Sequence, residues 1–411
     1  MLCTFAQVPI ALHYLGAEGY GLWIVLMTAF GIFNTIDFGL GAGIQLRMAE
    51  AFAQHDGPRL RQTFNTGAVA LALLAVGWAV IGLPLAWLGN WADWFHLSDP
   101  TLRGESSMAV AIIVVAAAAG LPGNAVAKMA AAVQLNWWHS LWNMVGNAAT
   151  LAAVWLAARM DWGFLQFVAV GALLPTVQNL GVWWLLGRQL GWKGPSPGLL
   201  SREETRRILK TSAWLSLPQT AFAALGWLPS LTISIGAGAQ AVTAFNLLQR
   251  LTSPVVHGQL VLLAPIWPVF AEAHVRGDVA WLRQARDKAL LATCGGVAVV
   301  ALICWQVPLL LSLWLGPNVE APPPALIWAS GAWCGLQLIG SFLNYYLMGV
   351  NRLRPLALFS TLGFVGSGVG LFVGASWGDA AWALALGSLA YGVLAIPGLA
   401  RASMSTTRPH L

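Results

Sequence analysis

Long apolar runs recur along the whole chain and are separated by short polar segments. A helix needs about 20 mostly apolar residues to cross the hydrocarbon core of a bilayer. The pattern therefore predicts an all-α polytopic membrane protein with about twelve transmembrane helices, six in each half of the chain. The expected helices cover residues 1–11, 19–45, 64–88, 107–133, 140–158 and 164–186 in the first half, and 211–235, 241–270, 289–315, 324–350, 356–375 and 380–399 in the second.

The first apolar run, from Met1 to Ala11, is shorter than the others. As a helix it would be about 16 Å long, whereas the hydrocarbon core is about 30 Å thick. A secretory signal peptide is an alternative, but no basic segment precedes the run and no small-residue cleavage site follows it. We expect a truncated first transmembrane helix.

One stretch of the first half returns in the second. Residues 49–62, AEAFAQHDGPRLRQ, align without a gap on residues 271–284, AEAHVRGDVAWLRQ, at an offset of 222 residues. Seven positions are identical, among them Asp56 and Asp278. We therefore expect two related halves, which is a recurrent plan of secondary transporters.

A polar segment separates the two halves. Residues 188–210 read RQLGWKGPSPGLLSREETRRILK, and this richness in Pro, Gly and charge is typical of a linker. Ser201, followed by Glu203 and Glu204, predicts the start of a surface helix. We expect a first six-helix lobe over residues 1–187, with its first helix truncated, a cytoplasmic linker over 188–210, and a second six-helix lobe over 211–411.

Composition agrees with a membrane protein, since 58% of the residues are hydrophobic and 9% are charged. The net charge of +6 reflects topology, because 18 of the 21 Lys and Arg residues fall on one side of the predicted bundle. Arg103 and Arg159 fall on the other side, and Arg250 lies within a helix. The positive-inside rule places the basic side, the linker and the C-terminus in the cytoplasm. Membrane lipids are expected partners, and nucleic acid is not.

Several kinds of chemistry are not indicated. The four Cys residues have no ligand spacing, and the seven His residues form no metal-binding motif. A Walker-type phosphate loop is missing, so we expect no ATP hydrolysis by this chain. We expect no cofactor and no metal. Any transport energy would come from a proton or sodium gradient, the membrane potential or the substrate gradient.

Two charged residues, Asp37 and Arg250, lie within apolar segments. An ionisable group in such a position is costly and is a candidate functional site. For Asp37 we predict ion coupling, and the alternative is a carboxylate that caps or packs a helix near Gly41. For Arg250 we predict substrate binding, because guanidinium is always charged and grips a phosphate or carboxylate through two hydrogen bonds. The alternatives for Arg250 are a structural pair with Asp37 and a side chain that reaches the membrane interface.

Amide side chains extend the candidate substrate site. Asn246 and Gln249 lie close to Arg250 in the same expected helix, and Asn143 and Asn147 are spaced i, i+4 on another. Amides are used in sugar sites, but they also join membrane helices through hydrogen bonds. Both interpretations stay open for these four residues.

The expected outer loop NWADWFHLSDP, residues 90–100, contains Asp93, His96 and Asp99. This cluster of acids and His has a composition compatible with extracytoplasmic catalysis. An interfacial loop explains it at least as well.

Four segments carry a resemblance to a known family: LGAEGYGLW, IDFGLGAGI and MAEAFA in the first half, and IWPVFAEAHVRGD in the second. They resemble the polysaccharide transporter family of lipid-linked oligosaccharide flippases, which includes the O-antigen flippases. The resemblance implies the fold of the multidrug/oligosaccharidyl-lipid/polysaccharide flippase superfamily, with two six-helix lobes in a MATE-like V around a central cavity. In the related lipid II flippases a central eighth-helix Arg is implicated in holding the diphosphate, and Arg250 falls on the matching helix. The charged residues of their first helix have no counterpart here, where only His13 lies near the end of that helix.

The function implied by this resemblance is transport, not enzymatic catalysis. The substrate would be a polyprenyl-diphosphate-linked oligosaccharide, moved across the bacterial inner membrane by alternating access for O-antigen and lipopolysaccharide, capsule or exopolysaccharide synthesis. A polysaccharide polymerase and chain-length machinery are candidate partners. A multidrug or cation antiporter of the same superfamily is the alternative, which Asp37 favours and Arg250 opposes. A membrane glycan polymerase or ligase is a third possibility, against which the short outer loops argue.

Overall fold

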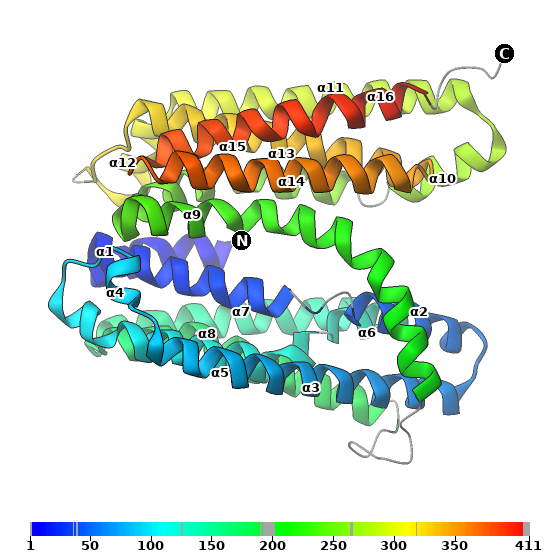
Figure 1. The fold of residues 1–411 in the computed structure, drawn as a ribbon, viewed down its shortest axis with the longest axis horizontal. Coiled ribbons are helices and arrows are strands. Elements are labelled where there is room, and N and C mark those ends of the chain that lie inside the picture. Colours follow the sequence, from blue (N-terminus) through cyan, green and yellow to red (C-terminus); the bar gives the residue numbers. More distant parts are fainter. Residues whose placement is uncertain are drawn as a thin grey trace. The chain divides into compact units, whose positions relative to one another are not determined.

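The computed structural model describes residues 2–35, 37, 40–124, 126–189, 191, 202–263, 266–317 and 319–405. These residues form helices and turns, and none of them is in a strand. The chain groups into two compact units, Met1–Thr220 and Ala221–Leu411 (Figure 1). Residues 190 and 192–201 of the predicted linker fall outside the described residues.

The first unit has eight helices and the start of a ninth within its described residues. They are α1 (Leu2–Thr35), α2 (Leu40–Ala53), α3 (Gly57–Leu88), α4 (Trp91–Trp94), α5 (Pro100–Asn124), α6 (Val126–Ala132), α7 (Asn136–Arg159), α8 (Phe164–Gln189) and the beginning of α9 (Arg202–Leu263). Helices α2, α3, α6 and α8 enclose an apolar core in which Ile44, Met48 and Phe64 are fully buried. This core holds the start of α2 and the short helix α6 in place.

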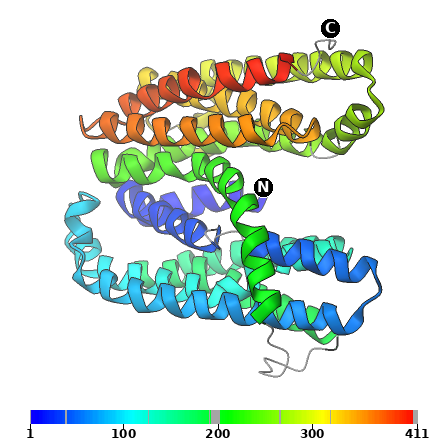
Figure 2. The same cartoon turned by 45° about the vertical axis from the view of Figure 1, so that its right-hand side comes forward.

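The second unit contains the rest of α9 and seven further helices among its described residues. They are α10 (Ile266–Arg276), α11 (Val279–Trp305), α12 (Val307–Leu315), α13 (Pro324–Gly349), α14 (Leu353–Ala375), α15 (Ala380–Leu394) and α16 (Ile396–Ser405). Helix α13 contacts α10, α11, α15 and α16, and its Tyr346 packs edge-on against Phe270 of α10. Figure 2 shows α14, in orange, lying beside α15, with which it makes extensive contact.

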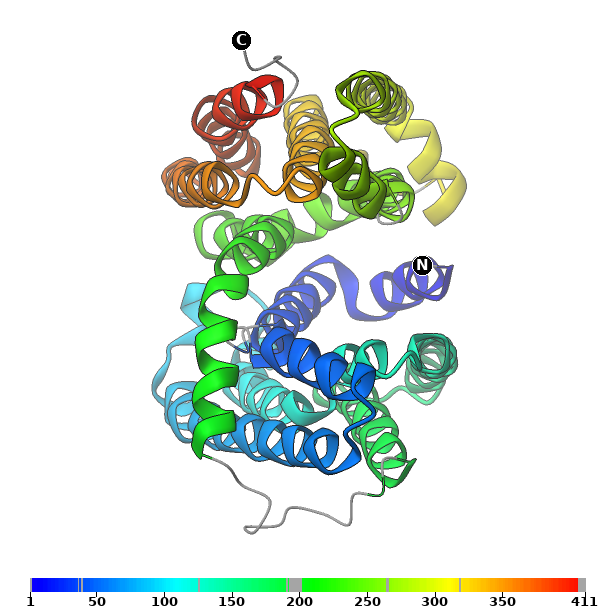
Figure 3. The same ribbon diagram turned by 90° about the vertical axis from the view of Figure 1, so that its right-hand side faces the viewer.

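Ten helices in the described part of the chain are long and apolar enough to cross a membrane. The difference from twelve arises because α1 and α9 each contain two of the expected segments. Each is interrupted by a glycine with left-handed backbone, Gly16 (φ 70°, ψ 177°) in α1 and Gly238 (φ 82°, ψ 173°) in α9. Glycine adopts such angles at little cost, so the chain bends at this one residue and continues as a helix on both sides of it. Figure 3 shows most helices of each unit close to end-on, with the start of α9, in bright green, seen from the side.

The two breaks belong to a wider repeat of the backbone. Eleven described residues have positive φ, and ten of them form five pairs at offsets of 222, 222, 220, 217 and 217 residues. The pairs are Gly16 and Gly238, His55 and Gly277, His96 and Gly316, Gln134 and Asn351, and Asp161 and Gly378. The predicted duplication is therefore confirmed in backbone geometry, including places where the side chains differ.

Hydrogen bonds at the matching segments explain why Asp56 and Asp278 are identical. Asp56 accepts a hydrogen bond from the backbone N of Arg59 (3.0 Å) and starts α3. Asp278 accepts one from the backbone N of Trp281 (2.9 Å) and starts α11. A side-chain oxygen at this position satisfies one of the free N–H groups of the first helical turn.

Several expected helix boundaries are wrong. The helices predicted over 64–88 and 289–315 begin earlier, at Gly57 and Val279, because the aspartate caps start them within polar sequence. The run 289–315 is also divided between α11 and α12, and the runs 19–45, 107–133, 241–270 and 380–399 are likewise each covered by two helices. Hydropathy alone does not register such breaks, because the residues on both sides remain apolar.

Candidate functional site

Asp37 lies between the end of α1 and the start of α2 and is only 8% exposed. Its Oδ2 accepts hydrogen bonds from the backbone N of Gly41 (2.9 Å) and from Nζ of Lys128 on α6 (3.2 Å). A Cβ at position 41 would stand 2.5 Å from this oxygen and 2.7 Å from Lys128 Cδ, so glycine allows the close approach. Asp37 thus caps α2, as one of its two interpretations expected, and pairs with Lys128. Its role in ion coupling stays a prediction.

Arg250 lies on α9 beyond the break at Gly238 and is half-buried. Its Nε is buried and has no hydrogen-bond acceptor among the residues that the structure describes. Ser253 and His257 follow it by three and seven positions, so the three residues lie along one stripe of the helix. The guanidinium is therefore half-buried, and its buried Nε–H has no acceptor among the described residues.

The amides predicted to accompany Arg250 lie on the same segment of α9. Asn246 is buried one turn before Arg250. Gln249 donates from Nε2 to the backbone O of Gly226 (3.3 Å), across the break in the helix. Gln249 also lines a cavity of about 380 Å³ within the second unit. The structure thus brings Arg250, Asn246 and Gln249 together, and their part in substrate binding stays a prediction.

The other predicted amides, Asn143 and Asn147, lie on α7 of the first unit. The Nδ2 of Asn143 is 3.0 Å from Nε2 of His139, a buried residue. Asn147 is exposed and donates from Nδ2 to the backbone O of Asn143 (2.8 Å). Neither contact joins two helices, and a role of these amides in binding stays a prediction.

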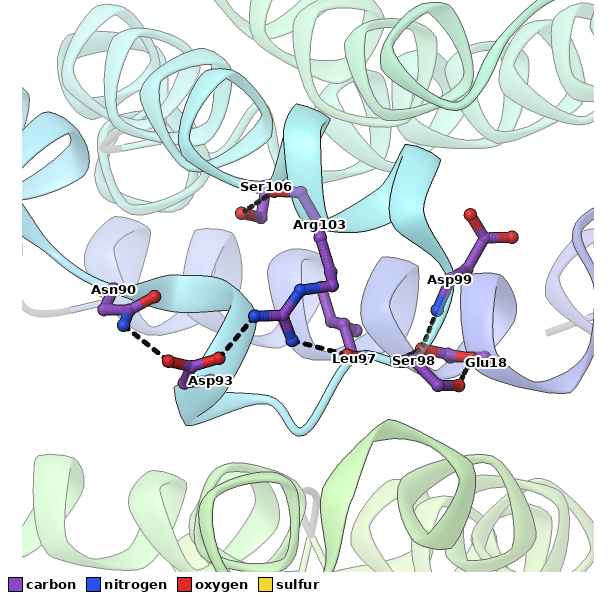
Figure 4. A network of polar contacts seen from close by, with 8 residues as sticks. All are labelled: Glu18, Asn90, Asp93, Leu97, Ser98, Asp99, Arg103 and Ser106. Carbon is purple, nitrogen blue, oxygen red and sulfur yellow. Dashed lines mark hydrogen bonds and ion pairs between the residues drawn. The ribbon is translucent and has the colours of Figure 1, made fainter.

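The loop between α3 and α5, predicted to lie on the outer side, contains a network of polar contacts (Figure 4). Asp93 pairs through Oδ1 with Arg103 (2.6 Å) and accepts through Oδ2 from Nδ2 of Asn90 (2.6 Å). The hydrogen bonds from Arg103 and from Asn90 hold the pKa of Asp93 below its usual value. Arg103 also donates to the backbone O of Leu97 (2.8 Å), which closes the loop on itself.

The remaining acids of this region also have structural partners. Asp99 accepts from the backbone N of Thr101 (2.7 Å) in the first turn of α5. Glu18, two residues after the break in α1, accepts from Oγ of Ser98 (2.6 Å) (Figure 4). Asp93 and Asp99 therefore hold an ordered loop, which agrees with its interpretation as an interfacial segment. In the part of the chain that the structure describes, no cluster of His, Cys, Asp and Glu could hold a metal ion.

The fold and these contacts define a polytopic membrane protein with two repeated lobes, one with Asp37 between two apolar helices and the other with Arg250 within one. The structure matches a multidrug resistance MATE family transporter of the MOP superfamily in an inward-facing conformation, with a TM-score of 0.79 and 16% identity over 99% of this chain and 94% of the other. An outward-facing structure of a MATE family transporter matches with a TM-score of 0.57 and 15% identity, over 99% and 95% of the chains. A MATE protein in a bent conformation matches with a TM-score of 0.59 and 17% identity, over 98% and 93%. Identities this low show the fold alone.

The sequence itself decides the family. The model of the family of polysaccharide biosynthesis proteins matches residues 1–274, and the chain belongs to that family. No curated protein matches the sequence. The predicted family resemblance and the MATE-like all-α membrane fold are thereby confirmed.

Proposed function

We propose that the protein is a flippase that moves a polyprenyl-diphosphate-linked oligosaccharide across the bacterial inner membrane, from the cytoplasmic to the outer leaflet. Its membership of the polysaccharide biosynthesis family, the ten helices of membrane-spanning length among its described residues and its MATE-like fold support this proposal. The glycan would serve a surface polysaccharide such as O-antigen, capsule or exopolysaccharide. Alternating access by the two repeated lobes would carry it across.

The observation that carries the proposal is the buried Nε of Arg250, which has no hydrogen-bond partner among the described residues. A buried donor without a hydrogen-bond partner is costly, and ionisable residues within apolar helices mark substrate or ion pathways. A diphosphate supplies what the guanidinium lacks, because its oxygens accept two parallel hydrogen bonds. Asn246 and Gln249 would add amide contacts next to it on the same helix.

Asp37 is the ion-coupling residue in this proposal. Its carboxylate holds both the start of α2 and Lys128 of α6. Binding of a proton or a sodium ion would weaken the attraction between Asp37 and Lys128, and a contact of this kind can bias a conformational equilibrium. The gradient of that ion would then drive the lobes from one state to the other.

A multidrug or cation antiporter with the same fold is less well supported by the described residues. Such a transporter needs an acid to attract its cationic substrate. The carboxylate of Asp37 already has a cation in Lys128, whereas the guanidinium of Arg250 has an unsatisfied donor. These charges fit an anionic substrate better. Overexpression that changes drug susceptibility would favour the antiporter instead.

The proposal also fixes an orientation, with the basic loops and the C-terminus in the cytoplasm. A polysaccharide polymerase and chain-length machinery would then take up the glycan at the outer face. Accessibility of a C-terminal tag from the cytoplasmic side checks this orientation.

Complementation of a flippase-deficient strain tests the proposed function, with surface glycan as the readout and membrane expression measured in parallel. We expect rescue by the wild type, partial rescue by Arg250→Lys, and none by Arg250→Ala or Asp37→Asn. A well-expressed wild type that fails with every lipid-linked glycan offered would refute the proposal.

A further inference from the structure

A partly open cavity lies within the second unit, between α9 and α13. Its volume is about 380 Å³, and its walls come from residues 226–260 of α9 and residues 330–337 of α13. This size is within the range of small-molecule sites. Because both walls belong to the same unit, the cavity does not depend on how the two units meet.

Two buried polar atoms at this cavity have no partner among the described residues. They are the indole Nε1 of Trp333 and the Oγ of Ser330, whose residues are 4% and 5% exposed. Buried polar groups are nearly always hydrogen-bonded, because leaving one unsatisfied costs its full desolvation. Trp333 and Ser330 lie one helical turn apart on α13, so both groups can serve one ligand.

The opposite wall adds hydrogen-bonding groups of α9. Gln249 uses one N–H for the backbone O of Gly226, which leaves its carbonyl oxygen as an acceptor. Nδ1 of His257 lies 2.9 Å from the backbone O of Ser253. A carbonyl can only accept, so this nitrogen carries the proton and the Nε2 of a neutral ring is an acceptor. The cavity therefore offers both donors and acceptors.

The described lining residues include no Asp, Glu, Lys or Arg. A cationic drug or a free phosphate would find no counter-charge there. The lining does include the indole rings of Trp227 and Trp333. Flat aromatic faces with a polar edge, together with amide, hydroxyl and imidazole groups, suit a neutral ligand that has an apolar face and several hydroxyl groups.

We infer that this cavity binds a single neutral pyranose ring. The inference rests on the proposed function and makes it more specific, because Arg250 lies on the helix stripe of Ser253 and His257, which line the cavity. The ring bound here would be the sugar attached directly to the diphosphate, with the phosphate oxygens at Arg250. The cavity selects the sugar, and the guanidinium selects the anion.

Saturation-transfer difference NMR on the full chain in lipid nanodiscs tests the inference. The probes are methyl β-D-glucopyranoside, methyl β-D-galactopyranoside and the methyl glycoside of N-acetylglucosamine, with cyclohexanol as an apolar comparison. Glycoside detergents must be removed beforehand, because their headgroups would compete. We expect saturation transfer to at least one glycoside and not to cyclohexanol.

The variant Trp333→Phe keeps a six-membered aromatic ring but removes the pyrrole part of the indole with its N–H, and Ser330→Ala removes the hydroxyl. Each should weaken glycoside binding about fivefold, the effect of one lost hydrogen bond. Ser330→Ala should not lower the melting temperature of the empty protein, because its hydroxyl has no partner among the described residues, whereas Trp333→Phe should lower it, because the smaller side chain leaves a void. Trp328→Phe is the matched control, since Trp328 lies on the same helix, is 53% exposed and does not line the cavity. It should bind as the wild type does.

Two outcomes would overturn the inference. One is the absence of transfer to any glycoside in a wild type that exports glycan, which would leave the flippase proposal intact. The other is equal binding by the wild type and Trp333→Phe. Conversely, specific glycoside binding by a wild type that exports no glycan would contradict the proposed transport function while supporting the sugar site.

Discussion

Replacement of Arg250 by methionine separates a binding role from a structural one. Methionine fills similar space on α9 but removes the charge and the buried Nε–H. A structural arginine contributes stability, so its loss destabilises the protein. An arginine that binds an anion lowers the stability of the empty protein, because its buried Nε–H has no partner among the described residues until the anion is bound.

The magnitude follows from the burial of the group. An unsatisfied buried donor costs about 1–3 kcal/mol, and the half-buried position of Arg250 places it near the lower value. Relief of about 1 kcal/mol raises the melting temperature of a unit of this size by about 2–4 °C. In Arg250→Met the bound diphosphate would lack one charge-assisted hydrogen bond, worth about 1.5–3 kcal/mol. The affinity for the diphosphate should therefore fall about 10- to 100-fold.

Thermal melting in nanodiscs and export by complementation provide the two readouts. Arg276→Met is the matched control, because Arg276 lies in the same unit, is exposed and pairs with Glu272 at the surface. We expect Arg250→Met to melt at or above the temperature of the wild type and to abolish export, whereas the control changes neither. A melting temperature lowered by several degrees, or normal export, would refute the assignment of Arg250 to an anion site.

Three further predictions concern the first unit and the repeated caps. Gly41→Ala should displace the carboxylate of Asp37 and reduce export as much as Asp37→Asn does, although no charge is lost; normal export by Gly41→Ala alone would contradict this. Asp56→Ala and Asp278→Ala should each lower stability by about 1 kcal/mol in thermal melting, and the Asn variants should retain most of it, since both residue types cap helices well. Because hydrogen bonds lower the pKa of Asp93, their contribution to loop stability is present above 3.8 and is lost as pH falls through the lowered value. Amide protection factors of residues 90–100 should therefore stay constant from about pH 8 to about pH 5 and fall only in stronger acid.

Most of the fold could be predicted from the sequence. Membrane helices are recognised by their hydropathy, and the repeat is recognised by its identical residues. The position of the breaks could not. Gly16 and Gly238 lie in apolar sequence that contains many other glycines, and a left-handed backbone is not visible in composition. The pairing of Gly16 with Gly238 at the repeat offset was nevertheless a signal in the sequence, beyond the segment in which side chains are identical.

The site was predictable only in part. Arg250 and Asp37 are visible because charges are rare in apolar runs, but nothing in the sequence distinguishes Lys128 from the other basic residues of the predicted cytoplasmic side. Its contact with Asp37 joins positions 91 residues apart, which a single sequence does not reveal. The part of α13 that lines the cavity was also not predicted as a site, because Trp and Ser are common in membrane helices. The spacing of Ser330, Trp333 and Gln337, which repeats at three and four residues, was the signal available there.

The contact between Glu18 and Ser98 gives the first unit a mechanical property. Glu18 comes two residues after Gly16, where α1 can bend most easily, and its carboxylate holds the loop that leads into α5. A rotation of α1 about Gly16 must therefore either pull this loop along or release it. The contact between Glu18 and Ser98 would therefore be kept or broken according to the angle of α1 at Gly16.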